Sequence, residues 1–247
     1  MRLLAVAAIL VAFPAAAEES RALGAPPGRI SQQMAEHAHG DHVYTLTQAQ
    51  ADFSRQSGSN VFNWDAEGWV GGDIRKFWWK TEGEHSGHEL EKAEIQGLYS
   101  HNVWTFFDAQ AGIRADVEPD ARAYAVVGVQ GLAPGLLETE LHAYLGFEGD
   151  VSIRLKQSVD VRLTNRFVLE PHFETDFYLT DAPARHIGSG VSNVEAGIEA
   201  RYEVTRKFAP TLAIIYESRL GETARLGRRA GEDAGGWSVR AGLRTWF

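Results

Sequence analysis

Apolar and polar residues alternate along the last segment of the chain. Within residues 236–247, one face of an extended strand takes the apolar side chains Trp237, Val239, Ala241, Leu243 and Phe247, and the opposite face takes Ser238, Arg240 and Arg244. A strand with lipid on its outside and water on its inside requires this alternation. The pattern therefore predicts a membrane-spanning β-strand.

The same two-residue period recurs along most of the sequence, in segments long enough for a tilted strand to cross a bilayer. We predict about twelve strands, an even number as bacterial barrels generally have. The predicted fold is all-β, a transmembrane antiparallel up-and-down β-barrel with both termini in the periplasm. The predicted strands are 43–54, 61–71, 74–84, 89–101, 103–117, 121–133, 136–149, 151–164, 166–179, 191–204, 208–220 and 236–247.

The charges within these segments favour a water-filled interior. In residues 151–164 the charged side chains Arg154, Lys156, Asp160 and Arg162 alternate with aliphatic ones. Burying an unpaired charge in the core of a soluble protein costs on the order of several kcal/mol. A lipid-facing outside and a charged inside accommodate both sets, so we expect a lumen with more carboxylates than bases. A narrow path that favours cations and a cross-linked interior both fit this lumen.

The connections support the same topology. Short polar or glycine-containing turns are expected at 71–73, 100–102, 133–135, 164–166 and 205–207, after every second strand. The intervening connections include longer ones, at 84–89, 180–190 and 220–235. Short periplasmic turns alternating with longer external loops are typical of outer-membrane barrels.

Two segments precede the predicted barrel of residues 43–247. Residues 1–17 begin with one basic residue, continue with an apolar stretch and end with small residues, which predicts a signal peptide. Residues 18–42 are polar and contain prolines, which predicts a flexible periplasmic tail. The expected location is therefore the outer membrane of a Gram-negative cell, with outer-membrane lipid as a partner.

Composition excludes several classes of function. The formal net charge of −9 argues against a nucleic-acid partner. The chain has no cysteine, so disulfides and thiolate metal sites are excluded. Motifs of serine hydrolases, zinc proteases and phosphate-binding loops do not occur, and we expect no enzyme activity. An outer-membrane lipid hydrolase is the enzyme alternative, but it needs a serine and a histidine on the lipid-facing side.

Candidate metal ligands fall into three groups. The tail holds Met34, His37, His39 and His42; imidazole and thioether suit copper, and imidazole also suits zinc and nickel. His85 and His88 lie in a predicted external loop. Inside the predicted lumen lie His142 and His172 with the carboxylates Glu140, Glu170 and Glu174. Each group also fits a structural role: a solvated linker, a polar loop, and histidines satisfied within a carboxylate ladder.

One stretch resembles a known family. The runs Trp64-Asp65-Ala66-Glu67-Gly68-Trp69 and Lys80-Thr81-Glu82-Gly83-Glu84 are similar to the hallmark of the copper resistance protein B family, and the likeness extends through residues 43–247. This resemblance implies an outer-membrane barrel associated with periplasmic copper-handling proteins. It implies that the chain binds copper ions or conducts them between the outside and the periplasm. Family members commonly have a tail rich in methionine, whereas Met34 is the one methionine here after the start residue, which favours histidine and carboxylate ligands.

Alternatives to copper conduction remain at this level. A closed barrel that sequesters metal, or that docks a periplasmic multicopper oxidase or copper chaperone, fits the same sequence. The lipid hydrolase is the third possibility.

Overall fold

The structure, a computed structural model, describes residues 43–247 apart from 57–58, 88, 183–184 and 232–233. The described residues are almost entirely β-strand. The strands are β1 (Tyr44–Gln56), β2 (Ser59–Gly71), β3 (Arg75–Ser86), β4 (Glu89–Trp104), β5 (Phe107–Glu118), β6 (Arg122–Ala133), β7 (Leu137–Gly146), β8 (Val151–Ser158), β9 (Val161–Arg162), β10 (Phe167–Tyr178), β11 (Gly190–Tyr202), β12 (Phe208–Arg219) and β13 (Gly235–Trp246). A helix, α2 (Gly221–Ala230), connects β12 to β13. No helix in these residues is long and apolar enough to cross a membrane.

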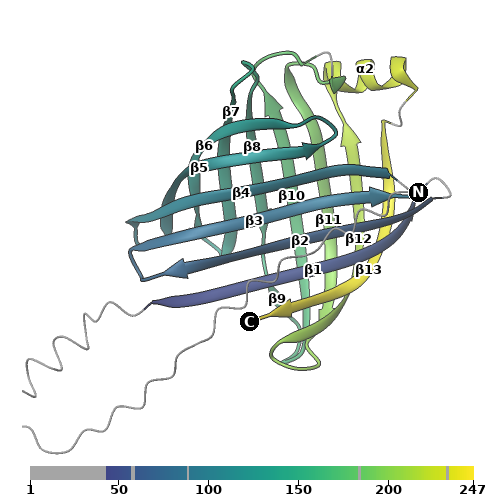
Figure 1. The fold of residues 1–247 in the computed structure, drawn as a ribbon. Coiled ribbons are helices and arrows are strands. Elements are labelled where there is room, and N and C mark those ends of the chain that lie inside the picture. The colour runs from purple at the N-terminus through teal and green to yellow at the C-terminus, as the bar shows by residue number, and fades with distance from the viewer. Residues whose placement is uncertain (1–42, 57–58, 88, 183–184, 232–233) are drawn as a thin grey trace, which may run out of the picture. The chain divides into compact units, whose positions relative to one another are not determined.

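The strands form a closed antiparallel barrel (Figure 1). Neighbouring strands pair in chain order, and β13 pairs with β1, from Ser54 opposite Arg240 to Gln48 opposite Trp246. Within the described residues the barrel has twelve long strands, and β9 is a two-residue segment that pairs with β10 beyond the end of β8. The predicted fold and strand number are confirmed.

The two ends of the barrel differ. At one end β1 begins and β13 finishes, together with the turns that follow β2, β4 and β6; we call it the terminal end. At the other end lie α2 and residues 179–182 and 185–189, and we call it the helix end (Figure 1).

Burial follows the predicted alternation. On β13, Ser238 and Arg244 are buried, whereas Trp237, Val239 and Leu243 are more than half exposed on the outer wall. The other strands repeat this pattern, so the exposed apolar residues form the surface that contacts lipid.

Several local expectations were wrong. The turn predicted at 100–102 lies at 105–106, because Ser100 and Asn102 face the lumen and donate hydrogen bonds to Asp108 of β5. The loop predicted at 84–89 is a tight connection after Ser86, and His85 lies within β3.

The strand predicted over 151–164 is interrupted. β8 pairs with β10 as far as Ser158 opposite His172, and pairing resumes at Val161 opposite Leu169. Pro171 lies in the gap and has no N–H to donate, so the ladder breaks there.

Candidate functional site

The lumen is the part of the molecule in which charged side chains gather. The inward faces of the strands supply carboxylates, lysines, arginines and two histidines, and most of them are buried or half-buried. Some of these residues pair with partners several strands away in the ring, and those ion pairs cross the lumen.

Arg154 of β8 is the centre of the largest group. Its guanidinium lies 2.9 Å from Asp176 Oδ1, 3.2 Å from Glu82 Oε1 and 3.5 Å from Glu94 Oε1. Glu82 and Glu94 belong to β3 and β4, several strands away around the ring, whereas Asp176 belongs to the neighbouring β10. Lys156 of β8 also reaches across to Glu82, with Nζ 2.8 Å from Oε2. These pairs tie opposite walls of the barrel together.

A second crossing contact joins β3 to β7. Lys80 forms an ion pair and a hydrogen bond with Glu140, and Glu140 Oε1 lies 2.9 Å from Nδ1 of His142. Nε2 of His142 lies 2.8 Å from Oε1 of Gln110 on β5. His142 has no exposed surface.

Aromatic and aliphatic side chains pack in the barrel interior next to these ion pairs. Leu98, Tyr124, Val126 and Tyr144 form a buried cluster on β4, β6 and β7. The guanidinium carbon of Arg114 lies 5.3 Å from the ring centre of Tyr124 and 4.8 Å from that of Tyr144, which are cation–π distances. This part of the interior is therefore packed.

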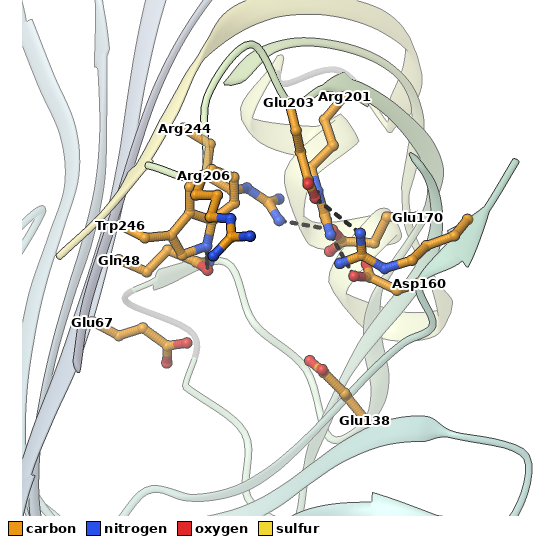
Figure 2. Close-up of a pocket in the computed structure, with 11 residues that line it drawn as sticks. Gln48, Glu67, Glu138, Asp160, Glu170, Arg201, Glu203, Arg206, Arg244 and Trp246 are labelled. Carbon is orange, nitrogen blue, oxygen red and sulfur yellow. Dashed lines mark hydrogen bonds and ion pairs between the residues drawn. The ribbon is translucent and has the colours of Figure 1, made fainter. Parts of the chain in front are cut away.

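Space remains at the terminal end. A cavity of about 470 Å³ opens there, and Figure 2 shows eleven residues around it. Its lining is mostly charged and includes Gln48, Glu67, Glu138, Asp160, Arg162, Glu170, Arg201, Glu203, Arg206, Arg244 and Trp246.

One side of this cavity is an arginine–carboxylate cluster. Arg201 pairs with Asp160 and lies 2.6 Å from Glu170 Oε2, which also accepts a hydrogen bond of 2.7 Å from Arg244. Arg244 in turn lies 2.9 Å from Glu199 Oε1. Both guanidinium groups are therefore paired with carboxylates within the protein.

Glu67 and Glu138 stand apart from that cluster, and their carboxylates face the open space in Figure 2. Among the described residues, the ion pair of Glu67 is with Lys80 at 3.4 Å, and that lysine is already bound to Glu140. Glu138 has no ion pair with any described residue. The cavity thus holds two carboxylates with little local compensation.

The structure places the predicted lumen histidines on the inside, as expected, but not together. His142 is level with Arg154 of β8, whereas His172 is level with Ser158, four residues further along the same strand. Nε2 of His172 lies 3.5 Å from Glu195 Oε1. The two imidazoles therefore do not share a ligand position.

The three predicted lumen carboxylates are each held by a cation. Glu140 pairs with Lys80, Glu170 with Arg201 and Arg244, and Glu174 with Lys156 and Arg154 at 3.4 and 3.3 Å.

The other predicted ligands are dispersed. His85 lines a smaller cavity of about 280 Å³ with Phe53 and Phe62. Met34, His37, His39, His42 and His88 lie outside the described residues. Within the described ranges, no three histidine, aspartate or glutamate side chains are grouped to hold a metal ion.

The helix end has contacts that the sequence did not indicate. Arg185, from the connection between β10 and β11, donates a 2.8 Å hydrogen bond to the hydroxyl of Tyr124 inside the barrel. Nearby, the backbone N–H of Ser189 donates to Asp181 at 2.6 Å and holds the pKa of that exposed carboxyl below its usual value. Gly188 and Thr223 join this connection to α2 through two hydrogen bonds.

Sequence reasoning missed several residues of the lumen. Lys80, Glu82 and Glu67 were noted for the family resemblance and not for their direction. Their alternation with Trp79, Thr81 and Gly68 was a signal that would have placed them inside.

The chain is similar to proteins of known family. A family model described as "Copper resistance protein B precursor (CopB)" matches residues 43–247. Copper resistance protein B of Escherichia coli is 38% identical over 205 residues, which are 83% of this chain and 69% of that protein. The Copper resistance protein B homolog of Pseudomonas syringae pv. tomato is 39% identical over 185 residues, 74% of this chain and 63% of that protein.

Solved structures resemble the barrel in fold alone. The NanC porin has a TM-score of 0.56 at 13% identity, over 80% of this chain and 98% of that one. The KdgM porin has a TM-score of 0.51 at 7% identity, over 82% of this chain and 99% of that one. Both are porin barrels.

Proposed function

Because this chain belongs to the copper resistance protein B family, we propose that its outer-membrane barrel acts in copper resistance by binding copper ions in the cavity at the terminal end of the lumen. Family and fold support the role in copper resistance and the location in the outer membrane. We add the place and the manner of copper handling. In the predicted orientation this cavity faces the periplasm.

The observation behind this proposal is the pair of carboxylates, Glu67 and Glu138, that face open space without a dedicated cation. Carboxylates that face a partly enclosed cavity with incomplete compensation raise the local concentration of cations. Carboxylate oxygen and imidazole nitrogen are both ligands for Cu(II).

The tail supplies the remaining ligands in this proposal. Two carboxylates alone hold an ion weakly, and no larger ligand group occurs among the described residues. The histidines at 37, 39 and 42 precede β1 in the chain, and Gln48 of β1 lines the cavity. We propose that these histidines exchange copper with the cavity.

Conduction through the barrel is the second candidate function. The open cavity favours it, since the lumen is accessible from one end. The ion pairs of Arg154, Lys156 and Lys80 cross the middle of the lumen and oppose free passage. We therefore propose that the resting barrel holds ions at one end, and expect low conductance in planar bilayers. A large, steady conductance would favour the conduction hypothesis instead. We also propose a non-enzymatic role and expect no esterase activity of the solubilised protein.

Equilibrium copper titration tests the binding proposal. The double variant E67Q/E138Q keeps side-chain size and removes both charges. We expect it to lose about tenfold or more in copper affinity, since hydrogen bonds and contacts to charged groups contribute roughly 1.5–3 kcal/mol each.

A matched control removes two carboxylates from the helix end. Asp120 and Glu148 are exposed there, so D120N/E148Q changes the net charge equally without touching the cavity. Equal copper affinity of the wild type and E67Q/E138Q would refute a site in this cavity. An equal loss of copper affinity in both double variants would show that the overall charge, and not a site in this cavity, causes the loss.

A further inference from the structure

The cavity at the terminal end is lined by charges of both signs. Glu67 on β2 and Glu138 on β7 face it from opposite sides (Figure 2). Arg206, in the turn between β11 and β12, lies on the side of Glu67, and Figure 2 shows its guanidinium directed into the cavity beside Arg244 and Trp246.

Arg206 differs from the other cavity arginines in its partners. Arg201, Arg244 and Arg162 each form ion pairs with carboxylates of the barrel. Arg206 forms none with the residues that the structure describes. Its five N–H donors therefore remain available to an anion from outside the protein, and a guanidinium binds a carboxylate with two parallel hydrogen bonds.

The cavity is larger than a bare ion needs. Its volume of about 470 Å³ lies in the range of small-molecule pockets. A hydrated copper ion occupies only part of that space and leaves the guanidinium of Arg206 without a partner.

We propose that this cavity takes copper as a complex with a small carboxylate chelator of the amino-acid type, not as the bare ion. This inference rests on the proposed copper function and specifies the chemical form of the substrate. Glu67 and Glu138 face the metal and the amino groups of the complex, and Arg206 binds a carboxylate of the chelator. Copper(II) has the highest affinity among the divalent first-row metals for such nitrogen and oxygen ligands, so chelated forms of it are abundant wherever such chelators occur.

The test compares two forms of copper on the full mature chain in detergent. One is Cu(II) in a weakly coordinating buffer, and the other is the bis-glycinate complex of Cu(II), with glycine alone as a blank. Quenching of tryptophan fluorescence reports binding, because Trp246 lines the cavity. The variant is Arg206→Gln, and the matched control is Arg75→Gln, an exposed arginine at the start of β3 at the same end.

The two forms should respond to Arg206→Gln in opposite directions. Binding of the bis-glycinate complex should weaken about fivefold or more, the scale of a charge-assisted hydrogen bond at a partly exposed site. Binding of the bare ion should stay unchanged or strengthen slightly, because a positive charge has been removed. Arg75→Gln should alter neither.

Three results would overturn the inference. They are equal effects of Arg206→Gln on both forms, unchanged binding of the chelate by that variant, or failure of the wild type to bind the chelate. Failure of the copper function itself looks different: neither form would then respond to E67Q/E138Q.

Discussion

Removal of the Arg154 guanidinium tests whether ion pairs across the lumen hold the barrel together. The substitution Arg154→Met keeps a long side chain and deletes the charge. In the native barrel this side chain is 7% exposed, and it pairs with Asp176, Glu82, Glu174 and Glu94 at 2.9, 3.2, 3.3 and 3.5 Å.

The four carboxylates do not lose their compensation equally. Glu82 and Glu174 keep Lys156, and Glu94 keeps Arg114 at 2.7 Å. Asp176 has no other ion pair among the described residues, so it becomes a buried charge without a partner. Breaking a buried pair in this way costs about 3–5 kcal/mol, which is the expected loss in the free energy of unfolding.

Chemical denaturation in detergent micelles, followed by tryptophan fluorescence, measures that free energy. The matched control is Arg162→Met, because Arg162 is 56% exposed and forms one ion pair with the described residues, to Glu203 at 3.4 Å. An exposed pair of this kind contributes about 0–1 kcal/mol. The double variant R154M/D176N should recover part of the lost free energy of unfolding, because it has no unpaired carboxylate at position 176. Losses of similar size for Arg154→Met and Arg162→Met, or a loss below about 1 kcal/mol for Arg154→Met, would refute the reasoning.

Three further predictions concern other parts of the chain. Gly128→Ala should destabilise the barrel by about 1–3 kcal/mol in the same assay, because the new Cβ would lie 2.2 Å from a neighbouring imidazole carbon and a backbone oxygen. The control Gly236→Ala should be nearly neutral, because its Cβ would meet nothing within 4 Å. Equal stabilities of the two variants would contradict the packing described here. Deletion of residues 18–42 should lower the copper stoichiometry and affinity of the mature protein in a titration, and identical values in both proteins would remove the tail from the mechanism. NMR titration should find the pKa of Asp181 below the usual 3.8, because the N–H of Ser189 stabilises the carboxylate; this contact then stabilises the folded state above the unfolded-state pKa and is lost as pH falls through the lower, folded-state pKa. A pKa at or above the usual value would contradict it.

The alternation of side chains was sufficient to predict the barrel. A period of two residues fixes which side chains face lipid, and the inward direction of His142 and His172 agrees with the structure. The alternation did not hold for Glu148, which was assigned to the lumen and lies exposed in the connection after β7. Family membership, inferred from the segment that contains Trp64 and Lys80, is confirmed as well.

The predicted strand boundaries were wrong where polar residues were compatible with either a turn or a strand that faces the lumen. Ser100 and Asn102 have the composition of a turn, but in a barrel with a wet interior they are strand residues whose partners lie across the sheet. The helix α2 was expected to be a loop, although its sequence has helix signals: Glu222 in the first turn, Arg228 in the last turn and Gly231 as C-cap with φ +83°.

The alternation along the sequence could not predict which charged side chains pair with each other inside the lumen. Alternation shows that Lys80 and Glu140 both point inward, but not that they meet across the barrel, 60 residues apart in the chain. That depends on the diameter, the strand tilt and the register, which only the closed ring of twelve strands fixes. For the same reason, Glu140, Glu170 and Glu174 looked like free ligands in the sequence and are paired with cations in the structure.

The most direct test of copper binding in this barrel is anomalous diffraction at the copper absorption edge from crystals soaked in copper. We expect a peak inside the cavity at the terminal end, between the carboxylates of Glu67 and Glu138, which is lost in crystals of E67Q/E138Q. Copper peaks confined to the outer surface or to the helix end, with none in that cavity, would contradict the account.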